Sequence, residues 1–292
     1  MTDSRTFLDI PYDEHIVPFP NTAAVLMQHA REFPDKPALC FRDKTYTYAA
    51  LRDLCLSADL SALNGAKPLV SLHDTQNGLL LMLILLSRGI PFDLDPQAAT
   101  HVRAAELPLT EKVPGDFEPP FVHLDDTAMV LDGTYRFSQY NLLVAAQAAG
   151  IAFKLFRNGD AVSALPLASV RDLVFGVLGP LYFAKTVRFS ADPGAEVLAG
   201  RAQYAWCADI LPDAPLLSGG LLRDAHMLFS REYPETLSPY ARYMPVYFDQ
   251  AAGLGPVTDL EGNLMNFLGV DIGRDGEAWT CEGHALGQTI VL

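Results

Sequence analysis

Residues 125–143 read Asp125-Asp126-Thr127-Ala128-Met129-Val130-Leu131-Asp132-Gly133-Thr134-Tyr135-Arg136-Phe137-Ser138-Gln139-Tyr140-Asn141-Leu142-Leu143. An apolar run of strand length comes first, and Asp132-Gly133 then has the composition of a tight turn between two strands. Ser138 stands where a helix N-cap is expected, because its hydroxyl can accept a backbone N–H from the first helical turn. The stretch therefore predicts two strands joined by a tight turn and followed by a helix.

The same alternation of helices and short apolar strands continues on both sides, which favours an α/β fold. The predicted helices cover residues 21–33, 49–63, 77–87, 138–154, 169–183 and 223–231. The predicted strands cover residues 38–41, 69–72, 92–94, 128–131, 161–165, 186–189 and 216–218. A hairpin is expected around Asp275-Gly276, with strands at 268–272 and 277–281, and the proline-rich segment 106–120 is expected to form a loop.

The composition is that of a globular chain with an acidic surface. The 292 residues are 50% hydrophobic, enough for one large or two ordinary domains, and the formal charge is −14. Nucleic acids and anionic membranes both require a concentrated basic face, so this charge disfavours them as partners. No apolar run approaches the roughly 20 residues of a membrane span, and the first residues lack the pattern of a signal peptide. We expect a cytoplasmic protein.

Reactive and metal-binding side chains are widely spaced. The four cysteines show no metal-ligand spacing, which favours reduced, buried thiols. They are Cys40, Cys55, Cys207 and Cys281. His123 beside Leu124-Asp125-Asp126 is interpreted as loop chemistry rather than as a metal or acid–base cluster. No Gly-x-Ser-x-Gly elbow is present. The sequence therefore assigns no catalytic residue and no metal site.

Several short segments occur in the order typical of one enzyme superfamily. They are residues 19–26, 29–39, 46–63, 79–96, 165–167, 176–181 and 217–220. The first reads Phe19-Pro20-Asn21-Thr22-Ala23-Ala24-Val25-Leu26, and residues 89–96 end in an Asp-Pro corner. Together with residues 125–143, this ordered set resembles the large domain of adenylate-forming enzymes, which include acyl- and aryl-CoA synthetases, luciferases and peptide-synthetase adenylation domains.

The resemblance implies a layered α/β large domain with mixed sheets flanked by helices. Residues 1–256 would form two α/β subdomains of an acyl-CoA-synthetase-like N-terminal domain. Residues 257–292 would be the remnant of its C-terminal β subdomain, because the chain ends at Leu292 inside text similar to the last sheet. We therefore expect a shortened member in which the small C-terminal lid domain is absent.

The segment from Asp132 to Ser138 departs from the pattern of the superfamily. Full members carry a Ser/Thr/Gly-rich loop ending in Lys-Gly, whose N–H groups, hydroxyls and lysine hold the β- and γ-phosphates. Here the segment supplies one glycine, one threonine and Arg136. We favour an ordinary turn and helix cap, and the alternative is a phosphate site rebuilt around Thr134 and Arg136.

A second departure affects the element that ends in Thr-Glu in the superfamily, where the glutamate helps to hold Mg²⁺. The matching residues run from Tyr247 to Gly253, with Gln250 at the threonine and Ala251 at the glutamate. Alanine cannot ligate a hard cation, and Asp249 is the alternative ligand. Ala168 and Ser169 replace the Phe-His of the acyl pocket. ATP and Mg²⁺ binding are therefore predicted to be lost, and no cofactor is expected.

A vestigial acyl or adenine pocket is the remaining candidate for a site. Ser218-Gly219-Gly220 resembles the glycine turn beside adenine, although a plain strand-to-helix turn explains the same residues. Four aromatic residues could line the pocket or pack in the core. These aromatic residues are Tyr204, Trp206, Tyr243 and Tyr247. The predicted ligand-binding set is Ser218, Gly219, Gly220, Tyr247, Asp249, Thr134 and Arg136.

Three functions remain open. The favoured one is a non-adenylating binding or regulatory subunit in acyl-thioester or secondary-metabolite assembly, with a small carboxylic acid or acyl group as its ligand. The others are an enzyme of another class that reuses the acyl pocket, and a ligase completed by a partner chain. A protein partner or homo-oligomer is expected at the C-terminal sheet. An acidic carrier protein would need a basic patch, for which Arg171, Lys185 and Arg188 are candidates, or these cations are simply scattered.

Overall fold

The computed structural model describes the following parts of the chain. These are residues 6–7, 10–11, 17–63, 67–72, 75–95, 122–131, 133, 135–152, 155, 159–165, 167, 170–193, 196, 199–202, 204–207, 218–223, 241–246, 257–258, 264–265, 271–275, 278–282 and 288–289. For the first two strands and for every strand after Trp206, the backbone alone is described.

Helices and strands alternate along the first 200 or so residues, as predicted. The helices are α1 (Thr22–Glu32), α2 (Tyr48–Ser57), η2 (Ser61–Leu63), α3 (Thr75–Arg88), α4 (Gln139–Ala152), α5 (Val170–Leu173), the π-helical η4 (Val174–Leu178) and α6 (Gly179–Tyr182). Among the described residues, no helix is long and apolar enough to span a membrane.

The strands form two large sheets. The nine-stranded sheet has the order β15 (Leu264–Met265), β14 (Val257–Thr258), β13 (Ala241–Val246), β12 (Ser218–Arg223), β11 (Tyr204–Cys207), β9 (Ala161–Ala164), β10 (Val187–Ser190), β3 (Pro37–Cys40) and β4 (Thr45–Thr47). The five-stranded sheet has the order β18 (Gln288–Thr289), β8 (Tyr135–Ser138), β7 (Thr127–Leu131), β6 (Phe92–Leu94) and β5 (Leu69–Val70). Two small hairpins pair β1 (Thr6–Phe7) with β2 (Ile10–Pro11), and β16 (Asp271–Asp275) with β17 (Ala278–Glu282).

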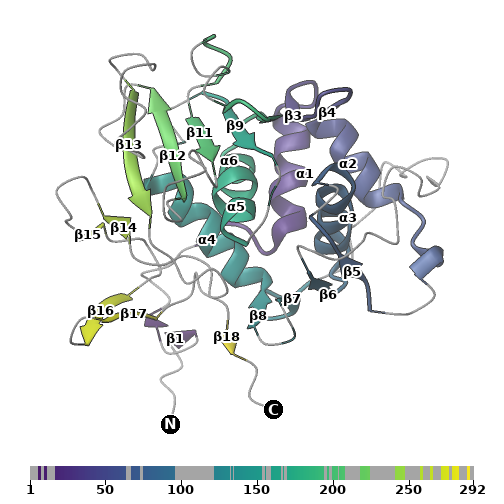
Figure 1. The fold of residues 1–292 in the computed structure, drawn as a ribbon. Helices are drawn as coiled ribbons and strands as arrows, with labels where there is room; N and C mark the ends of the chain where they lie inside the picture. The colour runs from purple at the N-terminus through teal and green to yellow at the C-terminus, as the bar shows by residue number, and fades with distance from the viewer. Residues whose placement is uncertain are drawn as a thin grey trace.

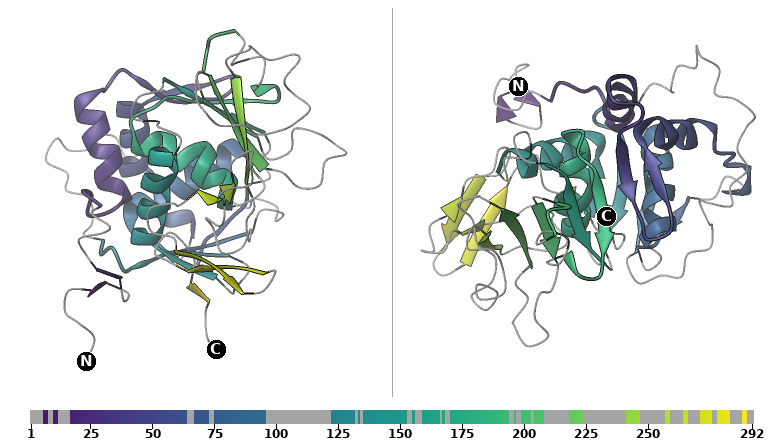
Figure 2. Two further views of the ribbon diagram at one scale, coloured as in Figure 1. Left: turned by 90° about the vertical axis from the view of Figure 1, so that its left-hand side faces the viewer. Right: turned by 90° about the horizontal axis from the view of Figure 1, so that it is seen from above.

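Helices lie between the strands of the two large sheets, and together they form a layered mixed α/β fold (Figures 1 and 2). Segment η4 packs on β9 and β11, and α4 packs on η4 and α6. Helix α1 contacts α2 and α3 on one side and α6 on the other (Figure 1). It therefore joins helices from the first half of the chain to a helix from the second half. The predicted layered α/β architecture, with mixed sheets flanked by helices, is confirmed.

Two predicted helix starts are confirmed by their caps. Asn21 precedes α1, and its side-chain oxygen accepts the backbone N–H of Ala24 at 2.9 Å. Ser138 precedes α4, and its hydroxyl accepts the N–H of Asn141 at 3.1 Å while its own N–H donates to the Asn141 side chain at 2.9 Å. Both caps satisfy donors that the first helical turn leaves without a partner.

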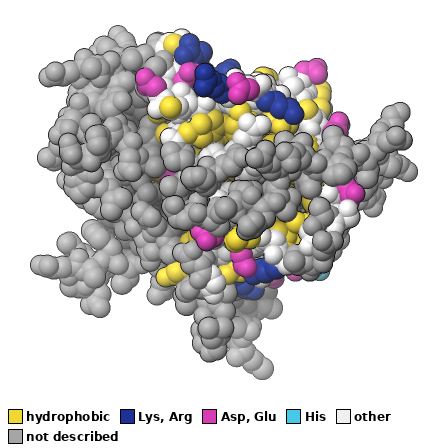
Figure 3. Space-filling model, turned by 45° about the vertical axis from the view of Figure 1, so that its right-hand side comes forward, with side chains coloured by type: hydrophobic (Ala, Val, Ile, Leu, Met, Phe, Trp, Pro, Cys, Tyr) yellow, Lys and Arg dark blue, Asp and Glu magenta, His cyan; other side chains and the backbone are white. Residues whose placement is uncertain are grey.

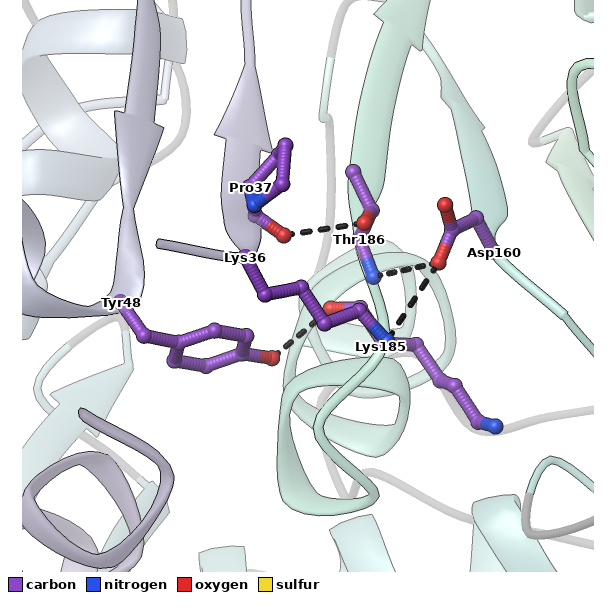
Figure 4. Close-up of polar contacts among 6 residues, drawn as sticks. All are labelled: Lys36, Pro37, Tyr48, Asp160, Lys185 and Thr186. Carbon is purple, nitrogen blue, oxygen red and sulfur yellow. Dashed lines mark hydrogen bonds and ion pairs between the residues drawn. The ribbon is translucent and has the colours of Figure 1, made fainter. Parts of the chain in front are cut away.

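A clamp at the amino ends of β3 and β10 joins the first half of the chain to the second (Figure 4). The Tyr48 hydroxyl donates to the carbonyl of Lys185 at 2.8 Å, and the Thr186 hydroxyl donates to the carbonyl of Pro37 at 2.9 Å. The Thr186 N–H donates to Asp160 at 3.0 Å, and Lys36 lies 3.8 Å from the same carboxylate. Burial raises the pKa of the Tyr48 phenol well above its usual value, so this hydroxyl remains a donor.

The structure corrects two predictions near the glycine pair. Gly219 and Gly220 were expected in a turn after a strand ending at Ser218, but residues 218–220 begin the six-residue strand β12. Gly219 and Gly220 pair with β11 on one side and with β13 on the other. These ladders on both edges outweigh the weak strand preference of glycine. The helix predicted at 223–231 is wrong at Arg223, which ends β12, and the rest of that range lies outside the described residues.

Smaller differences concern boundaries. The helix predicted at 49–63 ends at Ser57 and is followed by the 3-10 turn η2. The hairpin around Asp275-Gly276 is confirmed, since Asp275 pairs with Ala278. Strands β14 and β15 extend the nine-stranded sheet, whereas β18 joins the five-stranded one. The domain boundary after residue 256 stays a prediction, and the loop predicted at 106–120 lies outside the described residues.

Candidate functional site

The connection between β7 and β8 is a tight hairpin, as predicted. Leu131 pairs with Tyr135, so only residues 132–134 join the two strands. Gly133 has a φ of 66°, in the left-handed region that favours glycine, and the space around its Cα is open. A connection of this length offers few backbone N–H groups for a phosphate. Asp132 and Thr134 lie outside the described residues.

Arg136, the predicted cation beside this turn, lies on β8 opposite Val130 and Gln288. It is half-buried, and it takes part in interactions within the protein. Burial raises the pKa of the nearby Asp125 carboxyl, and the charge of Arg136 opposes that rise. The charge of Arg136 therefore acts on a neighbouring carboxyl group of the protein itself.

His123 and its acidic neighbours form a short turn. The backbone N–H of His123 donates to the Asp126 carboxylate at 2.9 Å, and the N–H of Asp126 donates to the carbonyl of His123 at 3.1 Å. This is the loop chemistry that the sequence indicated. In the part of the chain that the structure describes, no group of histidine, cysteine and acidic side chains could hold a metal ion.

Of the predicted ligand-binding residues, Ser218, Gly219 and Gly220 lie in the nine-stranded sheet, at the start of β12. Strands β9, β10 and β11 are parallel, so their carboxyl ends share one edge of that sheet. Ser218 pairs with Val246, which places the start of β12 and the end of β13 at the same edge. Tyr247 and Asp249 follow β13 in the sequence, and both lie outside the described residues. The sheet therefore brings Ser218 and the exit from β13 to the carboxyl ends of the parallel strands.

This edge is also where the direction of strand addition reverses. From β9 the chain crosses through α5, η4 and α6 to β10 on one side, and then passes to β11 on the other side of β9. Ligands of open α/β sheets bind in the crevice outside the carboxyl ends of the strands at such a switch point. The edge around Ser218 is therefore the candidate site, whereas Arg136 lies on β8 of the five-stranded sheet.

Trp206, one residue before the end of β11, packs in the core beneath this edge. Its side chain is fully buried and stacks on Phe175 of η4, with 4.5 Å between the ring centroids. Its indole N–H donates to Asp172 at 2.9 Å. Trp206 is one of the four aromatic residues that could either line a pocket or pack in the core, and the structure shows that it packs in the core. The side chains of Tyr204, Tyr243 and Tyr247 lie outside the described residues.

Asp172, which is 1% exposed, is a buried carboxylate that the sequence did not single out. The one available signal is an acidic residue within the apolar helical segment 170–182. The π-helical turn η4 lies next to it, and such turns are frequent at functional sites. An alanine Cβ at Gly176 of η4 would lie 2.4 Å from the Ser163 hydroxyl on β9. Helix and sheet thus approach each other closely directly below the candidate site.

Two of the cysteines and one of the predicted cations, Lys185, are described next. Cys40 and Cys55 are free and buried, as expected, and burial raises the pKa of the Cys55 thiol to about 12. Lys185 lies near Lys36, and burial together with that neighbouring charge lowers the pKa of Lys185. On the face drawn in Figure 3, Lys and Arg side chains alternate with acidic side chains along the upper rim. This mixture favours scattered cations over a basic patch on that face.

An apolar cavity of about 50 Å³ lies among the helices. The residues that line it include none of the predicted ligand-binding residues. Its walls come from α1, α2, α3, α4, η4 and α6, and they include His29, Tyr48 and Tyr182. The imidazole Nε2 of His29 is 3.0 Å from the carbonyl oxygen of Tyr182. Burial is the main reason why the pKa of His29 falls below its ordinary value of 6.5.

His29 is expected to make stability depend on pH. The carbonyl of Tyr182 and the charge of Glu32 favour the protonated ring and Lys36 disfavours it, but burial outweighs them. The unfolded chain therefore binds this proton near pH 6.5, and the folded chain binds it only at lower pH. The contribution to stability is complete above that pH and is lost as the pH falls through it toward the lower folded pKa.

Urea midpoints measured at about pH 7.5 and pH 5.5 check this, with the loss on acidification expected to shrink in His29→Gln. The exposed His123→Gln is the matched control and should keep the wild-type loss. An identical loss in His29→Gln and in the wild type would contradict the assignment.

No protein-family model and no curated protein matches this sequence. Solved structures match it. A malonyl-CoA ligase, in a ternary product complex with methylmalonyl-CoA and AMP, covers 87% of this chain and 70% of its own at 17% identity, with a TM-score of 0.58. Unliganded o-succinylbenzoate CoA synthetase from Bacillus subtilis covers 62% of this chain and 46% of its own at 18% identity, with a TM-score of 0.48. A fatty acyl-adenylate ligase from L. pneumophila, in complex with acyl adenylate and pyrophosphate, covers 63% of this chain and 43% of its own at 15% identity, with a TM-score of 0.48.

The comparison with malonyl-CoA ligase shows that this chain has the large-domain fold of adenylate-forming enzymes. The fold expected from the order of the sequence segments is therefore confirmed. At 17% identity the likeness concerns the fold alone. The chain spans less than half the length of the o-succinylbenzoate CoA synthetase and of the fatty acyl-adenylate ligase.

Proposed function

We propose that this chain is a non-adenylating relative of AMP-dependent acyl-CoA and acyl-carrier-protein synthetases that acts as a binding or regulatory subunit. Its role would lie in acyl-thioester or secondary-metabolite assembly. The observation that carries the proposal is the β7–β8 connection, in which the pairing of Leu131 with Tyr135 leaves residues 132–134 alone to join the strands. Ser138, the next serine along the chain, is already engaged in capping α4.

The energetics of adenylation support this proposal. The reaction brings a carboxylate against a highly anionic triphosphate, so the enzyme must supply cations and fixed donors where negative charge accumulates. Loss of one such donor typically costs about 3 kcal/mol of transition-state stabilisation. Here the phosphate loop with its lysine is replaced by a short turn, and Ala251 stands at the position of the metal-binding glutamate. ATP and Mg²⁺ binding would therefore be lost together.

The ligand that fits the proposal is a small carboxylic acid or an acyl group, bound at the edge of the nine-stranded sheet around Ser218. The support is the position of this edge at the switch point of the sheet. The matched malonyl-CoA ligase holds methylmalonyl-CoA and AMP, which supports an acyl ligand for this fold. A protein partner or a second copy of the chain would complete a subunit of this kind.

Pyrophosphate exchange tests the loss of adenylation. Purified protein is incubated with ATP·Mg²⁺, labelled pyrophosphate and a panel of short carboxylic acids, with a malonyl-CoA ligase as the positive control. We expect no exchange above background and no rise in melting temperature with ATP·Mg²⁺. Arg136→Gln is expected to change neither result. Exchange by the wild type that Arg136→Gln abolishes would overturn the proposal in favour of a rebuilt phosphate site.

Ligand binding is measured separately so that it can fail independently. The same acids and their pantetheine thioesters are titrated in the absence of ATP, with the melting temperature and tryptophan fluorescence as readouts. We expect saturable binding of at least one of these compounds. Exchange that begins only when a separately encoded partner is added would instead identify a ligase completed by a second chain.

A further inference from the structure

Lys185 differs from the other lysines whose side chains the structure describes. Each of the other three has a partner, since Lys36 and Lys67 each form an ion pair with an aspartate and Lys44 lies over a tyrosine ring. The Nζ atom of Lys185 makes no hydrogen bond and no ion pair within the described part of the protein. It is the one ammonium of this set whose charge is not neutralised by direct contact.

The backbone around Lys185 is fixed on both sides. Its N–H donates to the carbonyl of Pro180 in α6 at 3.0 Å, and its own carbonyl accepts the hydroxyl of Tyr48 at 2.8 Å. Ala184, with a φ of 54°, turns the chain from the end of α6 into the start of β10. The side chain of Lys185 therefore begins at a fixed point of the clamp, and it extends away from Tyr48 (Figure 4).

Burial and a neighbouring cation both act against the charged form of this amine. Lys185 is half-buried, and burial is the main reason why its pKa is lowered. The charge of Lys36 lowers the pKa further, while the carboxylate of Asp160 opposes the change. That carboxylate is already shared, because it lies 3.8 Å from Lys36 and accepts the N–H of Thr186 at 3.0 Å.

These are the conditions under which a lysine becomes a nucleophile. The neutral amine has a lone pair that the ammonium lacks, and enzymes obtain it by desolvating a lysine or by placing it next to another cation. Each unit by which the pKa falls raises the neutral fraction about tenfold, as long as the pH stays below the pKa. Lys44 and Lys67 are exposed and partnered, so they are the reference lysines of the same chain.

We propose that Lys185 is a modification site that accepts acyl groups from acyl thioesters. The neutral ε-amine attacks the carbonyl carbon of the thioester, a C–N bond forms and the C–S bond breaks. The sulfur leaves with the bonding electrons and takes up the proton that the nitrogen loses, directly or through water. The products are an amide on Lys185 and a free thiol, so no further reactant is needed.

Acylation would change the charge balance of the clamp. The amide is neutral, so Lys36 would lose a repulsive neighbour and would share Asp160 with no other cation. The modification needs only the thioester and this lysine. It is therefore independent of the proposed function, and a failure of acid binding at the edge of the nine-stranded sheet would leave it unaffected.

The test compares lysines within one sample. The full chain is incubated at about pH 7.5 with S-butanoyl-N-acetylcysteamine, and peptide mass spectrometry follows the butanoylation of each lysine over time. We expect Lys185 to react at least about fivefold faster than Lys44 and Lys67. The advantage should shrink as the pH approaches 10, because the reference lysines then lose their protons as well.

Two substitutions should shift the reactivity of Lys185 in opposite directions. Lys36→Gln removes the neighbouring positive charge, so acylation at about pH 7.5 should slow by roughly two- to threefold. Asp160→Asn removes the charge that favours the ammonium and keeps an oxygen for the N–H of Thr186, so acylation should accelerate. Lys67→Gln is the matched control and should leave the rate at Lys185 unchanged. Melting curves verify that each variant is folded.

Two results would overturn the proposal. The first is acylation of Lys185 at about pH 7.5 that is no faster than that of Lys67, which would show an ordinary surface amine. The second is an unchanged rate at Lys185 in both Lys36→Gln and Asp160→Asn, which would show that the surrounding charges do not activate the amine.

Discussion

Gly78→Ala is expected to destabilise the protein by about 3 kcal/mol or more, as severe overpacking does. Gly78 lies in the first turns of α3, where this buried helix crosses the backbone that follows β5. An alanine Cβ at this position would lie 1.7 Å from the carbonyl oxygen of Ser71 and 2.9 Å from its carbonyl carbon. Both are backbone atoms, so no side-chain rotation can relieve the overlap.

Two opposing effects decide the sign of this prediction. Alanine favours a helix interior over glycine by roughly 1 kcal/mol, so propensity alone would stabilise α3. The overlap instead requires α3 to move away from Ser71, and this would disturb contacts made by leucines that are fully buried along the helix. Packing should therefore outweigh propensity, because protein interiors are close-packed and leave no space for the shift.

Urea denaturation of Gly78→Ala measures the loss as a lower midpoint with a similar slope. Gly150→Ala in α4 is the matched control, since its Cβ would lie 1.9 Å from Cε2 of the Phe183 side chain. That ring is partly exposed and can turn, so the loss should be smaller. A midpoint for Gly78→Ala that equals or exceeds the wild-type value would show that α3 does not pass Ser71 so closely.

The fold was predictable from the sequence wherever local signals decide the structure. Asn21 and Ser138 each precede a helix, and each caps it as its residue type predicts. The Asp132-Gly133 turn, too, follows from local chemistry, because glycine at residue 133 adopts a positive φ. These features depend on residues within a few positions of one another, so a single sequence contains them.

The errors occur where pairing over long sequence separations decides the outcome. Ser218-Gly219-Gly220 has the composition of a turn, yet it is held as a strand by ladders to β11 and β13. The bond from Trp206 to Asp172 and the contact between His29 and Tyr182 likewise join residues far apart in the chain. Composition could not reveal these contacts, because they arise only when the helices pack on the sheet.

The candidate site was predictable in part for the same reason. Ser218 and the exit from β13 meet at one edge, because the β12–β13 ladder pairs Ser218 with Val246. The order of the strands in the sequence does not show that β11 lies beside β9, because β10 comes between them in the chain. The resemblance to the superfamily singled out Ser218-Gly219-Gly220 but assigned Gly219 and Gly220 to a turn, whereas both lie in β12.

Trp206→Ala is expected to destabilise the protein by about 4 kcal/mol, the usual cost of truncating a buried tryptophan. The side chain is fully buried, stacks on Phe175 at 4.5 Å and donates its indole N–H to Asp172 at 2.9 Å. The alanine variant would leave a cavity between η4 and β11. It would also remove one donor from a carboxylate that is 1% exposed.

A double-mutant cycle separates the two contributions. Trp206→Phe keeps an aromatic ring against Phe175 and removes the indole N–H, so it should cost roughly half as much as Trp206→Ala. If the hydrogen bond to Asp172 matters, Asp172→Leu, which removes both acceptor oxygens, should cost less in the Trp206→Phe background than in the wild type. Additive losses would contradict a coupling between the two side chains.

The cycle also bears on the candidate site, because Trp206 is followed by Cys207 at the carboxyl end of β11. The Trp206–Asp172 bond ties that strand to the segment 170–182, which connects β9 to β10. Loss of the bond should therefore loosen the carboxyl ends of β9 and β11 relative to each other. A folded Trp206→Phe variant that binds acids as tightly as the wild type would place the ligand away from this edge of the sheet.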